Sequence, residues 1–85
     1  MSETAPNRIK RLKMRSMRRG IKEMDIILSA YADSELAEMN EAKITLYDQL
    51  LDENDQDLYA WVTGQTVPPA QFQSLLSEIS QTFQK

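Results

Sequence analysis

The sequence predicts an all-α protein, a compact five-helix bundle that forms a single domain. Apolar residues recur at helical spacing along most of the 85-residue chain, and the alternation typical of strands is missing. A chain of this length has room for only one core. Because it contains no cysteine, no disulfide can stabilise that core, and stability must come from helix packing.

The predicted organisation is a disordered N-terminal tail over residues 1–7, followed by a helical domain over residues 8–85. Asn7 is expected to cap a short first helix over residues 8–17. A second helix follows Gly20 and ends before Asn40. Its apolar residues fall at offsets of 0, 3, 6, 7 and 10 and form one stripe that we expect to be buried: Ile21, Met24, Ile27, Leu28 and Tyr31.

A third helix is predicted to begin at the N-cap Asn40 and to end at residues 52–54. Met39 and Ile44 have the spacing of a hydrophobic staple at its start. A fourth helix is expected to begin at the N-cap Asp55. It should stop at Gly64, because glycine suits the left-handed conformation that often follows a helix.

The fifth helix is the most strongly patterned element. Pro69 fits its first turn, since the missing N–H of proline would be unpaired there. The apolar residues fall at offsets of 0, 3, 4, 7 and 11, and they are Phe72, Leu75, Leu76, Ile79 and Phe83. In the preceding helix we expect Trp61 to belong to the core and Tyr59 to point elsewhere, with a binding patch formed by both rings as the alternative.

Charge divides the chain into two parts. Residues 1–22 carry eight Lys or Arg and one acid, whereas residues 23–85 carry two Lys and twelve acids, for a net charge of −3. This asymmetry indicates partners rather than a fold. The basic run could follow nucleic-acid phosphates, or the basic helix could lie against the acidic remainder of the chain. The run consists of Arg8, Lys10, Arg11, Lys13, Arg15, Arg18, Arg19 and Lys22.

Composition disfavours several functions. The absence of cysteine and histidine removes most metal ligands, the usual general base and the thiol nucleophile, so we expect no catalytic residue, no metal and no enzyme. No apolar run approaches the roughly 20 residues of a membrane span, and the first residues lack an apolar signal region. We therefore expect a soluble, cytoplasmic protein. The arginine-rich opening has some likeness to a mitochondrial transit peptide, an interpretation that Glu3 and Pro6 disfavour.

Arg19, Gly20 and Glu23 form an unusual pattern, a glycine between basic residues and a carboxylate at the charge boundary. In one interpretation Gly20 ends the first helix, and Glu23 favours the positive end of the second. In the other, the missing side chain lets another surface approach the backbone, while Arg19 and Glu23, spaced i and i+4, flank that gap on one helix face. Met14 and Met17 are the methionines expected to be exposed contacts.

Two blocks carry a resemblance to a known family. Residues 18–25 resemble the RGxxE signature of the SdhE family, the FAD assembly factors of succinate dehydrogenase, called succinate dehydrogenase assembly factor 2 in mitochondria. Residues 55–61 resemble the family's second block, an acidic cap followed by Leu, an aromatic residue and Trp. The likeness covers residues 8–83.

The resemblance implies a helical chaperone that binds the flavoprotein subunit of succinate dehydrogenase, and in bacteria also that of fumarate reductase. Such a protein promotes covalent attachment of FAD to a histidine of that subunit. It implies no cofactor of the chain's own, because FAD belongs to the partner, and we expect the free chain to be monomeric. The expected partner-binding residues are Arg11, Arg15, Met17, Arg18, Arg19, Gly20, Glu23 and Asp25.

Two alternatives belong to other functional classes. A nucleic-acid-binding regulator that used the basic N-terminal helix would show a steep dependence of affinity on salt. An antitoxin-like regulator of an unrelated protein would bind its target without changing the flavin content of that target. The sequence leaves open which flavoprotein is the client and whether free FAD is bound.

Overall fold

Five α-helices and one short 3-10 helix form the part of the chain that the structure, a computed structural model, describes: residues 5–17 and 19–83. No strand occurs within these residues, so the predicted all-α, five-helix fold is confirmed. The elements are α1 (Ala5–Ser16), α2 (Lys22–Glu35), the 3-10 helix η1 (Leu36–Glu38), α3 (Glu41–Leu50), α4 (Asp55–Val62) and α5 (Ala70–Phe83).

The first helix begins earlier than the sequence indicated. It starts at Ala5, so Asn7 lies inside its first turn and does not cap it. Pro6 explains the difference, because proline is well tolerated in the first turn of a helix. Residues 1–4, the remainder of the predicted tail, lie outside the described residues, as does the side chain of Phe83.

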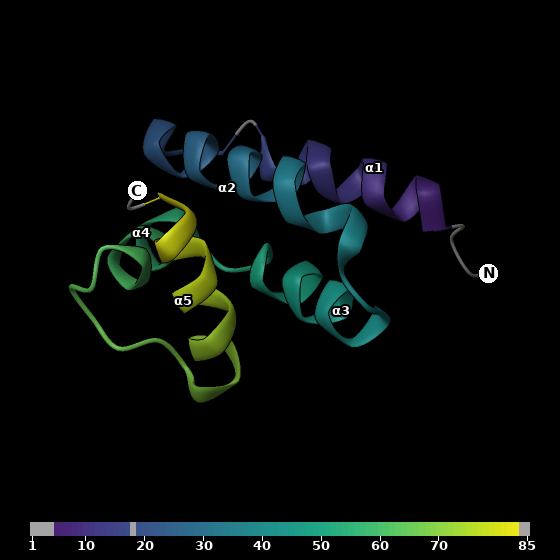
Figure 1. The fold of residues 1–85 in the computed structure, drawn as a ribbon. Coiled ribbons are helices and arrows are strands. Elements are labelled where there is room, and N and C mark those ends of the chain that lie inside the picture. The colour runs from purple at the N-terminus through teal and green to yellow at the C-terminus, as the bar shows by residue number, and fades with distance from the viewer. Residues whose placement is uncertain (1–4, 18, 84–85) are drawn as a thin grey trace.

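Helix α2 is the centre of the packing. Figure 1 shows it running beside α1, with α3, α4 and α5 all lying below this pair, α3 at the right and α4 and α5 at the left. It contacts α1, α4 and α5, while α3 also packs on α5. Four of the five residues in its predicted stripe are buried, and Ile21, which precedes the helix, is partly buried against the core.

The core is completed by the apolar faces of the other helices, with contributions at the predicted positions. The rings of Tyr31 and Tyr47 lie 5.7 Å apart between their centroids, which joins α2 to α3. Trp61 is only partly buried, with its ring 6.3 Å from that of Phe72, and Tyr59 also packs at the edge of the core. The remaining buried apolar residues of α3 and α5 are Ile44, Leu50, Leu75, Leu76 and Ile79.

Local chemistry sets most of the helix ends. Asn40 caps α3 as predicted, since its side chain accepts a hydrogen bond from the backbone N–H of Lys43 at 2.8 Å. Gly64 follows α4 with a φ of 81°, the left-handed conformation predicted there. Pro69 directly precedes α5 and does not lie in its first turn; its carbonyl accepts from the N–H of Phe72 at 2.9 Å.

The predicted cap of α4 is wrong by one residue. Asn54 is the N-cap, and its side-chain oxygen accepts from the N–H of Asp57 at 2.8 Å. Asp55 is therefore the first residue of the helix, and its carboxylate is available for other contacts. Within the described residues, no helix combines the length and the apolar character that crossing a membrane requires.

Candidate functional site

The segment that joins α1 to α2 contains the motif that the sequence singled out. We call residues 17–21 the linker; Arg18, one of the predicted site residues, lies outside the described residues. Ile21 occupies the N-cap position of α2 in an extended conformation and makes no side-chain capping hydrogen bond. Glu23 and Asp25 lie in the first turn of α2, where negative charge stabilises the helix.

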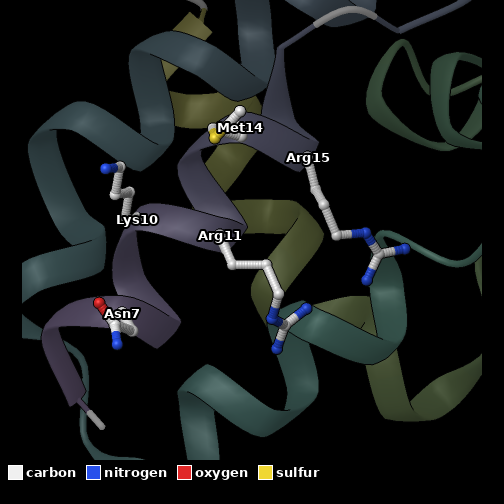
Figure 2. A pocket seen from close by; sticks show the side chains of 5 residues that line it. All are labelled: Asn7, Lys10, Arg11, Met14 and Arg15. Atoms are coloured by element: carbon white, nitrogen blue, oxygen red, sulfur yellow. The ribbon is translucent and has the colours of Figure 1, made fainter. Parts of the chain in front are cut away.

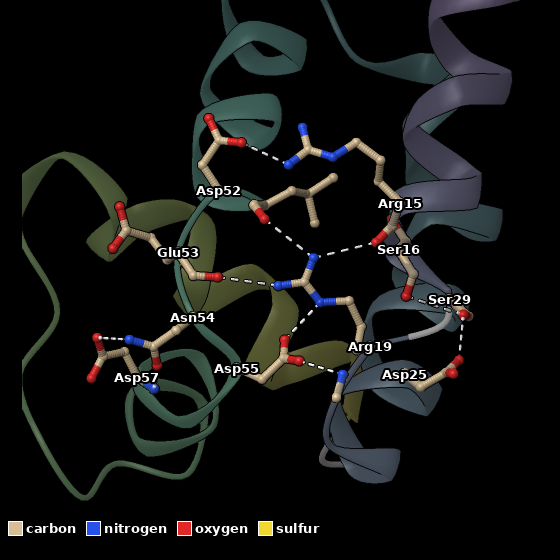
Figure 3. A network of polar contacts seen from close by, with 12 residues as sticks. Arg15, Ser16, Arg19, Asp25, Ser29, Asp52, Glu53, Asn54, Asp55 and Asp57 are labelled. Carbon is tan, nitrogen blue, oxygen red and sulfur yellow. Dashed lines mark hydrogen bonds and ion pairs between the residues drawn. The ribbon is translucent and has the colours of Figure 1, made fainter.

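Arg19 points into the protein. Its Nε donates to Asp55 Oδ1 at 2.7 Å, and the side chains of the two residues are only 11% and 17% exposed. The rest of the guanidinium donates to three backbone carbonyls, those of Arg15 at 3.3 Å and of Leu51 and Glu53 at 3.2 Å each. Figure 3 shows the side chain spanning the space between the end of α1 and the junction of α3 with α4.

The expectation that Arg19 and Glu23 share a helix face is wrong. Helix α2 begins at Lys22, so the i, i+4 geometry of a helix does not reach back to residue 19. The carboxylate that pairs with Arg19 is Asp55, which lies 36 positions along the chain. Glu23 stays exposed at the surface.

Gly20 lies against the same carboxylate. Its backbone N–H donates to Asp55 Oδ2, and a Cβ built on Gly20 would meet that oxygen at 3.0 Å. Among the described glycines only Gly64 has a positive φ, so Gly20 does not adopt the left-handed conformation of a helix-ending glycine. The close approach that Gly20 permits is therefore internal, whereas the other side of the residue is exposed.

Three large apolar side chains in or near the linker are exposed. Met14, Met17 and Ile26 are 53%, 48% and 57% exposed, so both methionines are at the surface as expected, and their contact with a partner stays a prediction. Asp25 is partly buried, and its carboxylate accepts from Ser29 Oγ at 3.3 Å. Of the acidic residues in the motif region, Glu23 is thus the one that faces solvent.

The basic side of α1 is largely neutralised by α3. Arg11 and Arg15 bind opposite oxygens of Asp48 at 3.0 Å and 2.7 Å, and Arg15 also binds Asp52 at 2.6 Å. The hydrogen bond from Arg11 holds the pKa of Asp48 below its ordinary value of 3.8, and the charges of Arg11 and Arg15 add to this effect. The basic helix therefore lies against acidic residues of the same chain, which was one of the two interpretations of the charge asymmetry.

A shallow groove of about 420 Å³ lies on the outer side of α1. Figure 2 shows Lys10 and Met14 on one side of it, while Arg11 and Arg15 reach across toward α3. Lys10 forms no ion pair with the residues that the structure describes. The groove is lined by Asn7, Lys10, Arg11, Met14 and Arg15.

Comparison with known proteins identifies the family. Residues 10–83 match the family model described as flavinator of succinate dehydrogenase. The chain therefore belongs to this family, as the sequence motifs indicated, and the family is one of assembly factors rather than enzymes. Over the residues described, no group of three His, Cys, Asp or Glu is placed to hold a metal ion.

Curated relatives carry the name succinate dehydrogenase assembly factor 2, mitochondrial. The relative from Aspergillus terreus is 51% identical over 53 residues, which is 62% of this chain and 18% of the relative. The relative from Schizosaccharomyces pombe is 38% identical over 72 residues, 85% of this chain and 52% of the relative. The relative from Drosophila grimshawi is 35% identical over 74 residues, 85% of this chain and 50% of the relative. The chain thus spans no more than about half the length of these relatives.

The predicted cytoplasmic location is contradicted by these names. The matched relatives are mitochondrial proteins, which points to mitochondria rather than to the cytoplasm.

One residue of the site was assigned another role by the sequence. Asp55 was predicted to be a helix cap, and periodicity gives no sign that it binds a segment 35 and 36 residues earlier. A signal was nevertheless present. Asn54 and Asp55 are adjacent residues of the two types that cap helices best, and only one of them can occupy the N-cap position.

Proposed function

We propose that this chain is an assembly chaperone that binds the flavoprotein subunit of succinate dehydrogenase and promotes covalent attachment of FAD to it. The family match over residues 10–83 carries the proposal. The names of the relatives support a role in succinate dehydrogenase assembly. The flavoprotein subunit and FAD attachment are what the RGxxE resemblance implies. The flavoprotein of fumarate reductase is a second client of the same chemistry.

A binding protein can promote this reaction without reacting itself. Attachment of FAD requires a histidine of the partner to be held near the flavin, and it requires negative charge that develops on the flavin to be stabilised. Both requirements depend on the conformation of the flavoprotein, which a docked chaperone can fix. The chain then needs no cofactor of its own and acts as a monomer.

The docking surface that we propose is the exposed side of the linker and of the first turn of α2. Met17 offers apolar area, Gly20 leaves the backbone accessible from outside, and Glu23 supplies an exposed charge. Arg19 faces the protein interior, so its part in docking is indirect. Arg11 and Arg15 already bind Asp48 of α3, and Arg15 also binds Asp52 after it, so their contribution to binding is expected to be smaller than that of Glu23.

The pairing within the protein also disfavours the nucleic-acid alternative. Phosphate binding by Arg11 or Arg15 would have to replace contacts with Asp48 and Asp52 that are already made. An antitoxin-like role has no specific observation in its favour.

Titration of the purified chain against the isolated flavoprotein subunit tests the proposal. Glu23→Gln removes one exposed charge at the start of α2, and Glu35→Gln removes one at the end of the same helix, which makes it a matched control. We expect Glu23→Gln to weaken binding and Glu35→Gln to leave it unchanged. Equal losses from both variants, or an affinity that falls steeply with salt for wild type and variants alike, would indicate diffuse electrostatics and contradict a defined docking site.

A further inference from the structure

The described residues of the linker, 17 and 19–21, belong to no helix or strand. The linker lies between two helices, its last residue provides no side-chain cap, and Met17 projects into solvent. The N–H of Met17 donates to the carbonyl of Met14 at 3.2 Å, which belongs to the last turn of α1. The conformation of residues 19 and 20 must therefore be fixed by contacts from elsewhere in the fold.

Asp55 supplies these contacts with both of its carboxylate oxygens. Oδ1 accepts from the side chain of Arg19, and Oδ2 accepts from the backbone N–H of Gly20. We call Arg19, Gly20 and Asp55 the clasp. Since both charged side chains are largely removed from water, their hydrogen bonds are stronger than those of an exposed ion pair.

Arg19 extends the clasp to the end of α3. Its Nη atoms donate to the carbonyls of Leu51 and Glu53, which lie after the last residues of α3 and have no helical partner. Asp55 in turn is free to bind because Asn54 caps α4. The side chains of Arg19 and Asp55 thus bind each other and four backbone groups, as the dashed lines in Figure 3 show. These groups are the carbonyls of Arg15, Leu51 and Glu53 and the N–H of Gly20.

Position 20 leaves little room for a side chain in this arrangement. A Cβ at 3.0 Å from Asp55 Oδ2 would press on the same oxygen that accepts the backbone hydrogen bond. That oxygen cannot move away freely, because Arg19 holds the other oxygen of the carboxylate at 2.7 Å. The contact with Asp55 therefore explains a glycine at position 20 without any contact to a partner.

We propose that Asp55 is a positioning residue for docking: by holding Arg19 and Gly20 it fixes the linker, so that Met17 and Glu23 face the flavoprotein in one arrangement. The inference rests on the proposed function and divides the motif by role. Glu23 contacts the partner, whereas Arg19 and Gly20 act through Asp55. The two sequence blocks that carry the family resemblance are then halves of one structural unit.

The expected effect follows from the population of the arranged linker. The apparent dissociation constant equals the intrinsic one divided by the fraction of molecules in the competent conformation, so lowering that fraction to one tenth weakens binding about tenfold. Met17 and Glu23 are unchanged in such a molecule. The affinity for the flavoprotein therefore falls although every residue that contacts it is still present.

The test uses the full chain with Asp55→Asn and, as matched control, Asp52→Asn. Asp52 also binds an arginine, at 2.6 Å, but its side chain is 71% exposed and that arginine, Arg15, belongs to α1 and not to the linker. Two quantities are measured: hydrogen exchange of the Gly20 amide in the free protein, and affinity for the isolated flavoprotein subunit. In Asp55→Asn we expect faster exchange at Gly20, retained protection in the helices and affinity weaker by about tenfold, with neither change in Asp52→Asn.

Asp55→Glu provides the second variant if Asp55→Asn does not fold. It keeps the charge but moves the carboxylate by one methylene group toward Gly20, so a smaller loss of affinity and of Gly20 protection is expected together. Wild-type affinity in a variant whose Gly20 amide exchanges freely would overturn the proposal. Weakened affinity with full Gly20 protection would also overturn it, because Asp55 would then act on the partner directly. If the wild-type chain does not bind the flavoprotein at all, the proposed function fails, while the exchange of Gly20 still reports whether the clasp exists.

Discussion

Replacement of Leu12 by alanine should destabilise the protein more than removal of the Asp48 charge. Both residues hold α1 against the rest of the fold, but by different means. Leu12 is fully buried, whereas Asp48 binds Arg11 and Arg15 through side chains that are 27%, 39% and 33% exposed. The comparison therefore decides whether apolar packing or charge pairing fixes the helix that precedes the docking surface.

The magnitudes follow from these exposures. Truncation of a fully buried leucine removes apolar area from the core and leaves a cavity, which costs about 2 to 5 kcal/mol. Each partly exposed ion pair of Asp48 contributes roughly 0.2 to 1 kcal/mol, so the two together supply at most about 2 kcal/mol and less in high salt. The loss in the free energy of unfolding should therefore be larger for Leu12→Ala, even when both ion pairs of Asp48 have favourable geometry.

Urea unfolding followed by circular dichroism, at low and at high salt, measures the two effects. We expect Leu12→Ala to lower the free energy of unfolding by about 3 kcal/mol at either salt concentration. Asp48→Asn should cost about 1 kcal/mol at low salt and less at high salt. Asp33→Asn is the control, because its carboxylate forms an exposed pair with Lys13 at the long distance of 4.0 Å. The reasoning is refuted if Asp48→Asn costs as much as Leu12→Ala.

Three further predictions concern pH and helix ends. The hydrogen bond from Arg11 lowers the pKa of Asp48, so its ion pairs stabilise the fold at pH values above the ordinary carboxyl pKa of 3.8. This contribution is lost as the pH falls below 3.8. The difference in Tm between wild type and Asp48→Asn should therefore shrink over that range. Burial raises the pKa of Tyr47 to about 12, so stability should decline as the pH rises above the ordinary value of 10.0, and tyrosinate absorbance from Tyr47 should appear only with unfolding seen by circular dichroism. Asn54→Ala and Gly64→Ala should each cost about 1 kcal/mol in urea unfolding, the first by removing a cap and the second by forcing an L side chain to a φ of 81°.

The helices and the core could be predicted from the sequence because their signals are local. Helical spacing in the sequence marked four residues of α2 and four of α5 that are buried in the fold, and the cap at Asn40 depends on a residue only three positions away. Exact helix starts were less certain where two suitable residues are adjacent, as at Asn54 and Asp55. In that case Asn54 is the cap, and Asp55 makes a tertiary contact with Arg19 and Gly20 that is absent from any local pattern.

The candidate site could be located from the sequence, but its internal geometry could not. The motif marked the correct segment, yet spacing along a presumed helix paired Arg19 with Glu23, while the fold pairs it with a carboxylate 36 residues away. The charge asymmetry likewise left open whether the basic run binds an outside partner or lies against the acidic remainder of the chain. In the fold, much of the positive charge on α1 meets Asp48 and Asp52 of the same chain, because α3 packs within reach of these arginines.

The most direct test of the central claim is covalent flavin on the client. A succinate dehydrogenase flavoprotein subunit is produced with the wild-type chain, with the Glu23→Gln variant and with neither, and flavin fluorescence of the denatured subunit is measured in a gel against its total amount. Assembly-factor function predicts a fluorescent band that is strongest with the wild-type chain and reduced with Glu23→Gln. Equal fluorescence per subunit with and without the chain would contradict the claim for that client.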